Sequence, residues 1–279
     1  MRYQALTTKL PLMGASAMRR TPSGGLVITE VLRLEAPWFE PVIKRIEQQL
    51  ELQLRLGRPW VTLRPMLLLG EPGSGKSWFA KRVAVLASCG HATADLAGCM
   101  DATLIAGNPR GWLSAQPVFP ALVMNQCTTA NPVLIVEELD KAGGSERYGD
   151  PITSLLQLIE PQTASAVYDK CLLCEIDVSQ CSWIMTANAV GPQLPRAFLS
   201  RLEIIEIATP PLDMFDEVVA SIIRALMARW QLPAAMTPVV PTGARRVLRA
   251  DFTRHRSIRR IAQLVERIAA GCLPETVIH

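Results

Sequence analysis

The sequence predicts an α/β fold in which helices flank a parallel sheet and a smaller helical region follows. Three observations support this prediction. A short apolar run at 66–69 leads through a glycine-rich turn into a helix-compatible segment at 78–87. Two further apolar stretches, 131–136 and 183–186, have the length of buried strands. The pattern from Met214 onward is helical. Strands that alternate with helices along a chain are typical of a parallel sheet.

The remaining elements can be assigned from apolar periodicity. Residues 26–34 alternate and are rich in β-branched residues, which favours a strand or a lead-in segment before the first helix. Residues 39–56 have apolar side chains at helical spacing and predict that helix. The other expected elements are, in chain order, a strand at 93–96, an irregular stretch at 98–120, a helix at 152–159, a strand at 204–207 and a helix at 257–270.

The composition is that of a globular chain with an ample core. It has 279 residues, of which 49% are hydrophobic, and a net charge of +4 that does not by itself indicate nucleic acid. No apolar run approaches the length that spans a bilayer. Seven irregularly spaced cysteines favour a reducing compartment over a disulfide framework.

The first 29 residues carry basic side chains and no acid before Glu30. We expect a disordered or loosely docked arm here, with an organellar transit peptide as the alternative. Because the apolar core of a secretory signal is absent from this segment, the cytoplasm is the default location and an organellar matrix is the alternative.

A glycine-rich segment between the strand at 66–69 and the following helix predicts a phosphate-binding loop. Its residues are Gly70, Glu71, Pro72, Gly73, Ser74, Gly75, Lys76 and Ser77. The glycines let the backbone turn its N–H groups toward phosphate oxygens, and the helix start adds a favourable dipole. Lys76 is then placed to reach the β- and γ-phosphates, and Ser77 to bind Mg²⁺. The sequence therefore predicts that the chain binds a nucleoside triphosphate.

Polar side chains end two of the other expected strands. The strand at 131–136 is followed by Glu137 and Glu138, and the strand at 183–186 is closely followed by Asn188. Downstream of a phosphate-binding loop, such acids bind Mg²⁺ and activate water, and we assign the metal to Glu137 and the water to Glu138. Asn188 could hydrogen-bond the γ-phosphate or the water. Acids after a strand are also common helix caps, so this assignment depends on the loop.

Three further patterns have a structural as well as a functional interpretation. Trp38 and Phe39 lie where an adenine base could be held, but two aromatic residues before a helix favour core. The three cysteines of 171–181 include a C-x-x-C pair that suggests zinc, yet no second pair follows, which disfavours a metal site. The arginine-rich segment 245–260 favours a solvated helix face over DNA binding.

The order of these motifs resembles the AAA+ ATPases, and within them the ATPase module of Lon-type proteases. The match is most specific in three segments: PVLIVEELDK at 132–141, GDPITSLLQLIEPQ at 149–162 and DKCLLCEIDVSQCSWIMTAN at 169–188. It extends from about Trp38 to about Arg267 and is weaker at both ends. The resemblance implies a P-loop module with a five-stranded parallel sheet and a small C-terminal helical lid domain. It also implies assembly into a ring, most often a hexamer.

The resemblance implies a role for each motif. Residues 70–77 correspond to Walker A, and Glu137 with Glu138 to Walker B. The other positions that match the family pattern are Asn188 (sensor 1), Arg201 (the arginine finger that reaches a neighbouring subunit's nucleotide), Arg259 (sensor 2), and the pair Trp112 and Leu113 (a pore loop that grips polypeptide). ATP and Mg²⁺ are the implied ligands.

The sequence departs from the family pattern at four points. Glu137 replaces the usual Walker B aspartate, Pro37-Trp38-Phe39 replaces a histidine-tyrosine-glycine, two extra residues lie between Asn188 and Arg201, and the chain ends after the small domain. The first departure could slow hydrolysis, and the last predicts that the chain is not a peptidase. We expect an arm at 1–29, a large α/β domain at 30–211 and a helical lid at 212–279.

The expected function is that of an ATP-driven protein remodeller or unfoldase motor, which assembles as a homo-oligomer and acts on polypeptide, away from membranes. A nucleic-acid-associated ATPase that uses its arginine-rich lid on DNA is the first alternative. A slowly hydrolysing ATP-dependent switch or scaffold subunit is the second, because Glu137 is one methylene longer than aspartate. The aromatic residue at the pore-loop position, Trp112, favours the remodeller.

Overall fold

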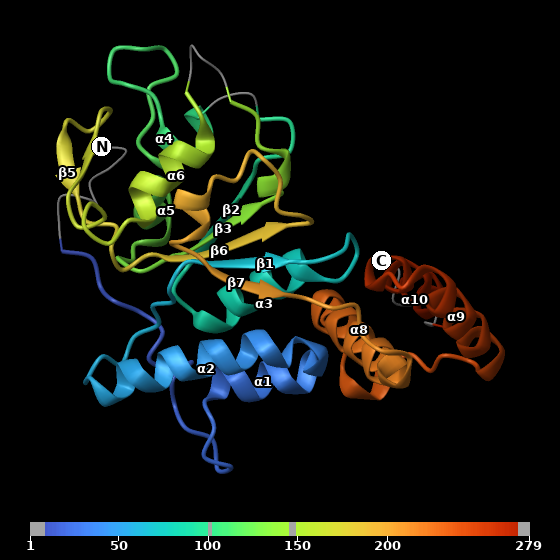
Figure 1. Ribbon diagram of the computed structural model, residues 1–279. Coiled ribbons are helices and arrows are strands. Elements are labelled where there is room, and N and C mark those ends of the chain that lie inside the picture. The colour runs from blue at the N-terminus through green and yellow to red at the C-terminus, as the bar shows by residue number, and fades with distance from the viewer. Residues whose placement is uncertain (1–8, 100–101, 145–148, 273–279) are drawn as a thin grey trace.

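A five-stranded parallel sheet lies at the centre of the molecule (Figure 1). The computed structural model describes residues 9–99, 102–144 and 149–272. The strands are β1 (Met66–Leu69), β2 (His91–Asp95), β3 (Val133–Glu137), β6 (Ser182–Ala187) and β7 (Glu203–Glu206), and their order in the sheet is β2-β3-β6-β1-β7. Every neighbouring pair is parallel. The predicted five-stranded parallel sheet is confirmed.

The register of the sheet brings the carboxyl ends of its central strands together. β1 pairs with β6 so that Leu69 lies opposite Ala187, and β3 pairs with β6 so that Val136 lies opposite Met185. The loops that follow these strands therefore leave from the same edge of the sheet. In open α/β sheets, ligand sites lie at this edge.

Helices cover both faces of the sheet (Figure 1). α1 (Val27–Glu35), α2 (Glu40–Arg55) and α3 (Lys76–Ala87) lie on one face, and α4 (Thr103–Ala106), α5 (Phe119–Cys127), α6 (Pro151–Ile159) and α7 (Arg196–Leu199) lie on the other. The side chains of β1 alternate between the two resulting cores, with Met66 and Leu68 in the first and Leu67 in the second. The two-residue period of a strand dictates this alternation. α4 lies inside the stretch predicted to be irregular, because four residues are too few for a periodic pattern.

Residues 27–35 form helix α1 rather than the strand that their β-branched composition favours. Ile28 and Leu32, four residues apart, are fully buried in the core that α1 shares with α2. Arg33 adds ion pairs to Glu40 and Glu47 of α2, at 3.1 and 2.6 Å. Burial of each such aliphatic side chain contributes about 1.5–3 kcal/mol, which outweighs a strand preference of at most about 1 kcal/mol.

Residues 9–26 pack along the α/β part of the chain before α1 begins. Asn131, fully buried just before β3, accepts a hydrogen bond from Met13 N at 2.8 Å and donates to Met13 O at 2.9 Å. Ala17 and Met18 are buried in the same core as α1. The expected boundary of the arm at residue 29 falls inside α1, and residues 1–8 of the arm lie outside the described residues.

Three helices after β7 build a hydrophobic core of their own (Figure 1). They are α8 (Phe215–Trp230), α9 (Thr242–His255) and α10 (Ile258–Cys272), and they bury Phe215, Phe252 and Ile261. Short 3₁₀ turns at Pro37–Phe39, Leu139–Lys141, Leu212–Met214 and Ala234–Met236, and a hairpin of β4 (Val167–Asp169) and β5 (Cys174–Ile176), complete the described elements. In the part of the chain that the structure describes, no helix is long and apolar enough to cross a membrane.

Candidate functional site

The glycine-rich loop between β1 and α3 adopts a conformation that depends on its glycines. Gly73 and Gly75 have positive φ values of 84° and 94°, which residues with a Cβ atom rarely adopt. A Cβ atom on Gly70 would lie 2.3 Å from the main-chain oxygen of Ile207. α3 begins at Lys76, directly after the loop, so its first turn supplies N–H groups that have no partner within the helix. This is the geometry of an anion-binding loop.

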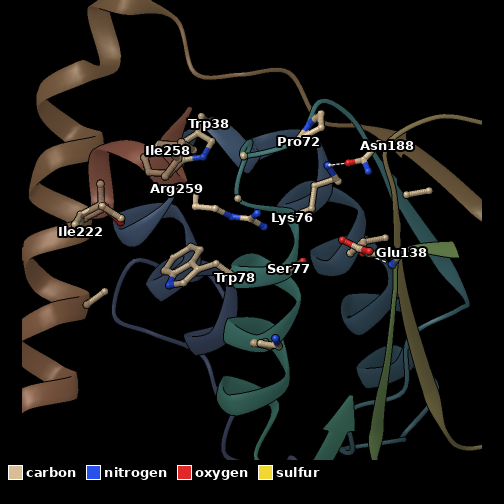
Figure 2. A pocket seen from close by; sticks show the side chains of 18 of the residues that line it. Trp38, Pro72, Lys76, Ser77, Trp78, Glu138, Asn188, Ile222, Ile258 and Arg259 are labelled. Atoms are coloured by element: carbon tan, nitrogen blue, oxygen red, sulfur yellow. Dashed lines mark hydrogen bonds between the residues drawn. The ribbon is translucent and has the colours of Figure 1, made fainter. Parts of the chain in front are cut away.

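Lys76 is a buried cation at this loop, with an exposure of 7%. Its Nζ donates to the main-chain oxygens of Gly70 at 2.6 Å and Glu71 at 2.9 Å, and to Asn188 Oδ1 at 3.2 Å (Figure 2). Burial lowers the pKa of this ammonium, and the nearby carboxylate of Asp140 opposes that shift. Neutral oxygens therefore hold the ammonium at the place where phosphate oxygens can replace them.

Two acids follow one another at the carboxyl end of β3. Glu138 has a positive φ of 59°, and its side chain points from the strand end toward Ser77 (Figure 2). Its carboxylate accepts a hydrogen bond from Lys141 Nζ at 2.7 Å. Glu137 is paired with Lys81 of α3 at 2.9 Å and does not line the cavity described below. Each of the two acids therefore has a lysine partner.

The first residues of α10 contact the glycine-rich loop from the helical region. Ile258 N donates to Gly73 O at 2.9 Å, and Arg259 N donates to the same oxygen at 3.4 Å. The Arg259 side chain extends from there toward Lys76 and Ser77 (Figure 2). The α/β part and the helical region thus meet at the phosphate-binding loop.

These elements enclose a cavity of about 700 Å³. Its charged end contains the loop together with Glu138, Asp140, Asn188 and Arg259. Its other end is mostly apolar, and the apolar side chains there come from segments distant in the sequence. Trp38, Trp78, Ile222 and Ile258 lie at this end (Figure 2), and Leu226 and Ala262 also line the cavity. A cavity with one charged and one apolar end fits a nucleoside triphosphate, because its phosphates are charged and its base is a flat, uncharged ring.

Trp38 and Phe39 have different environments although they are adjacent in the sequence. Phe39 is fully buried and stacks on Phe79, with ring centroids 4.2 Å apart. Trp38 lines the cavity, and its indole Nε1 is buried without a hydrogen-bond partner among the described residues. The sequence-based preference for core is correct for Phe39, whereas Trp38 faces the cavity.

Ser77, Glu137 and Asp140 offer the oxygen donors that Mg²⁺ prefers. Ser77 and Asp140 line the cavity, and Oδ1 of Asp140 is buried without a partner in the described part of the chain. Hydroxyl and carboxylate oxygens are hard ligands that suit this ion. The residues present therefore fit a Mg²⁺ ion beside the phosphate-binding loop.

Besides Glu137, three of the expected site residues lie away from the cavity. Arg201 Nε donates to Glu160 Oε2 at 2.8 Å, and 40% of the Arg201 side chain remains exposed. Trp112 is 55% exposed and Leu113 is fully exposed, in the loop at 107–117. The structure therefore does not bring Arg201, Trp112 or Leu113 into the cavity of their own chain.

The structure also bears on the cysteine-rich segment, as a possible metal site, and on the arginine-rich segment, as a possible basic surface. Among residues 9–99, 102–144 and 149–272, no three His, Cys, Asp or Glu side chains are grouped as metal ligands. Within the arginine-rich segment, Arg245 pairs with Asp216 at 2.6 Å and Arg260 pairs with Asp251 at 2.7 Å. Acids of the same chain therefore neutralise part of the basic run.

The sequence does not single out several residues of the cavity. Trp78, Lys81 and Asp140 lie within a few positions of the motifs, and Asp140 carries a signal because it is the third acid of one short segment. Ile222 and Leu226 come from α8 and belong to no motif of the loop or the strands. The tertiary structure alone brings α8 to this cavity.

Comparisons with known proteins identify relatives of the chain. Residues 66–209, slightly more than half of the chain, match the ATPase family associated with various cellular activities (AAA). The chain is similar to the Lon protease of Rhizobium meliloti, with 28% identity over 241 residues, which cover 85% of this chain and 29% of that protein. It is also similar to the Lon protease of Rickettsia bellii, with 34% identity over 143 residues, which cover 51% of this chain and 18% of that protein. The mitochondrial Lon protease homologue of Saccharomyces cerevisiae is 31% identical over 139 residues, which cover 50% of this chain and 12% of that protein.

A solved structure has a similar fold. A closed-state reconstruction of Hsp104 with ATPγS and FITC casein matches with a TM-score of 0.65 at 18% identity, over 86% of this chain and 45% of that one. The chain spans 12–29% of the length of the three Lon proteins named above. The likeness to AAA+ ATPases and to the ATPase module of Lon-type proteases, implied by the motifs, is confirmed. The chain belongs to the AAA family of ATPases.

Proposed function

We propose that this AAA ATPase hydrolyses ATP with Mg²⁺ and, as a homo-hexameric ring, couples hydrolysis to the remodelling of polypeptides. The observation that carries the proposal is the cavity that unites the phosphate-binding loop with Glu138, Asn188 and Arg259. The loop, Glu138 and Asn188 follow three different strands, and Arg259 comes from α10. Such a set meets only in the folded chain, and it contains the parts that phosphoryl transfer requires.

Each side chain at the charged end has a role that its chemistry allows. Lys76 and Arg259 neutralise phosphate charge. Ser77 would hold Mg²⁺ together with Glu137, which lies outside the cavity lining and must first separate from Lys81; the ion supplies further charge neutralisation when it is bound. Glu138 acts as the general base that accepts a proton from the attacking water. Asn188 donates an amide N–H to the γ-phosphate or to that water.

The position of Arg201 supports a ring. This residue follows α7 and does not line the cavity of its own chain, and Glu160 accepts a hydrogen bond from its half-exposed guanidinium. A cation at such a place suits the charge that develops on the γ-phosphate of an adjacent subunit. We therefore assign Arg201 as the finger that completes the neighbouring site.

The loop at 107–117 supports a polypeptide substrate. It exposes Trp112 and Leu113 side by side, and adjacent exposed apolar side chains mark interaction sites. The face of an indole ring packs against side chains of an extended chain with little sequence preference. The Hsp104 reconstruction contains FITC casein. We propose that this chain acts on a substrate of the same class, an unfolded polypeptide.

A slow ATP-dependent switch is the second candidate function. It is favoured by the two lysine pairs at the acids, Lys81 with Glu137 and Lys141 with Glu138. Each pair must separate before its acid can serve the metal or the water, and this requirement slows hydrolysis. Turnover near zero combined with tight ATP binding would select the switch over the motor.

Partner and location follow from weaker features of the chain. A nucleic-acid partner has less support, because two arginines of the basic segment pair with acids of their own chain. Free thiols of the described residues include Cys89, Cys127, Cys171, Cys174 and Cys181, which fits a reducing compartment. We propose the cytoplasm, with an organellar matrix as the alternative. Peptide cleavage forms no part of the proposed activity.

A substrate trap tests the proposed function. Glu138→Gln leaves Lys76 unchanged but removes the carboxylate that acts as general base. ATP should therefore bind while hydrolysis falls about 10²–10⁴-fold. With ATP, the trapped ring should co-elute with FITC-casein in size-exclusion chromatography. The matched control adds Trp112→Ala to the trap, and it should assemble and bind ATP but lose the casein. Normal turnover of Glu138→Gln, or casein capture that does not need Trp112, would contradict the proposal.

A further inference from the structure

Two hydrogen bonds connect the buried lysine of the loop, through an asparagine, to an acid outside the assigned motif positions. Lys76 Nζ donates to Asn188 Oδ1 at 3.2 Å (Figure 2), and Asn188 Nδ2 donates to Asp140 Oδ2 at 3.3 Å. All three residues line the cavity. Asp140 therefore contacts the amide that the proposed function places at the γ-phosphate.

The fold holds Asp140 in place from several sides. The residue lies in the 3₁₀ turn Leu139–Lys141, which starts directly after the left-handed conformation of Glu138. Leu139 is fully buried, and the side-chain amide of Gln193 donates to the main-chain oxygen of Asp140. Oδ1 of Asp140 is itself buried, with no partner in the described ranges. The main chain of Asp140 is thus held in place, and its carboxylate contacts the Asn188 amide through Oδ2.

The chemistry of its two neighbours permits one orientation of the Asn188 amide. An ammonium only donates and an ionised carboxylate only accepts, so the amide oxygen faces Lys76 and the amide nitrogen faces Asp140. One N–H of the amide is used on Asp140, and the second remains to donate elsewhere. If the amide were turned over, like partial charges would face each other at both contacts.

Asp140 becomes more important once substrate is bound. The bond from Lys76 to Asn188 is longer than the bonds from Lys76 to Gly70 and Glu71, and phosphate oxygens compete for the same ammonium. When Lys76 turns to the phosphates, Asp140 is the neighbour that still fixes the amide. We propose that Asp140 is a positioning residue that holds the Asn188 amide with one N–H toward the γ-phosphate or the attacking water. This inference rests on the proposed function.

A double-mutant cycle between Asp140 and Asn188 tests the inference. Asp140→Ala should lower kcat about 10- to 100-fold, the range expected for the loss of a hydrogen bond to a charged group. The Kd of a fluorescent ATP analogue should change by less than about threefold, because the loop and Lys76 still bind the phosphates. In the Asn188→Ala background, Asp140→Ala should add no further loss, because Asp140 acts through the amide.

Two further measurements make the outcome clear. Asp95→Ala removes a carboxylate that lies at the end of the neighbouring strand β2 and accepts from Ala97 N at 2.9 Å; this control should leave kcat unchanged. Thermal unfolding of the four nucleotide-free proteins of the cycle reports the contact without activity. The Tm loss of the double variant should be smaller than the two single losses together. Asp140→Asn keeps the shape without the charge and replaces Asp140→Ala if that variant does not fold.

Additive losses in kcat, or additive losses in Tm, would overturn the inference. A Kd that weakens by the same factor as kcat/KM falls would also overturn it, because a positioning role acts on the transition state. If the wild-type protein does not hydrolyse ATP, the proposed function fails, and the Tm cycle still decides whether Asp140 holds Asn188. If the wild type is active and Asp140→Ala is equally active, only this inference fails.

Discussion

The two ends of the cavity differ in how the chain builds them. Apart from Arg259 of α10, the charged end consists of short motifs, namely five residues of the phosphate-binding loop and the polar residues that follow β3 and β6. The apolar end takes Trp38, Trp78, Ile222 and Leu226 from three separate segments of the chain. Recognition of a triphosphate is therefore a local property of the sequence. The environment of the base depends on where α8 and α10 lie against the α/β part.

The largest expected effect concerns the charged end. Lys76→Ala should abolish detectable ATP binding, because main-chain N–H groups alone do not neutralise the phosphates that the ammonium serves. Isothermal titration calorimetry with ATP measures this loss. Lys44→Ala removes an exposed lysine from α2 and should bind ATP as the wild type does. Undiminished affinity in Lys76→Ala would show that the loop is not a phosphate cradle.

Arg201→Ala asks whether the charged end is complete within one chain. Binding of ATP should remain nearly intact. Hydrolysis should fall by up to about 10³-fold, which is the low end of the range of about 10³–10⁵ for arginine fingers in GTPases. Mixing this variant with Lys76→Ala should restore part of the activity, because each subunit supplies what the other lacks. Arg196→Ala, an exposed position on α7, serves as the control. Specific activity of the wild type that does not depend on protein concentration would speak for a working monomer instead.

Trp78→Ala addresses the apolar end. We expect the Kd for ATP and for ADP to weaken together by about tenfold, because an aromatic contact contributes about 0.5–1.5 kcal/mol beyond its buried area. The value of kcat should change little, since the charged end is intact. Fluorescence titration gives both Kd values. Trp60→Ala is the matched control, because the Trp60 indole is bonded to Gln180 at 3.1 Å and does not line the cavity. A fall in kcat without a change in Kd would contradict the idea that the apolar end serves binding and the charged end serves hydrolysis.

The smallest effect is expected for Glu137→Asp, which restores the side chain usual in the family. Hydrolysis should be unchanged or faster, because a shorter carboxylate is less able to remain paired with Lys81 at 2.9 Å. The rate is measured as a function of Mg²⁺ concentration. Glu175→Asp on β5 makes the same change at an exposed position and serves as the control. A large loss of activity would show that the backbone of β3 is adapted to the longer side chain.

The division between the two ends also describes what the sequence can predict. The loop, Glu138 and Asn188 are predictable because each follows an apolar strand within a few residues. The sheet is predictable for a related reason, because β1, β3 and β6 each contain a run of three or four apolar residues. Local patterns carry no information on which distant segment covers them. The cavity-facing side of Trp38 and the contribution of Ile222 therefore require the tertiary structure.

The first helix illustrates the same limit for the fold. Its residues favour a strand by composition, and the helix forms because Ile28 and Leu32 find a core to pack against. That core is built with residues of α2 and β1, which lie further along the chain. Local propensity is a weak signal wherever burial decides the conformation.

The hydrogen bond from Ile258 N to Gly73 O makes the glycine-rich loop a mechanical link as well as a binding site. A loop that adjusts to bound or released phosphates pulls on the first turn of α10 through this bond. Linkage requires the converse, so that a force on the helical region changes the affinity for the nucleotide by a matching factor. In the ring proposed above, we therefore expect load from a neighbouring subunit or from a polypeptide under tension to change the affinity of each subunit for its nucleotide.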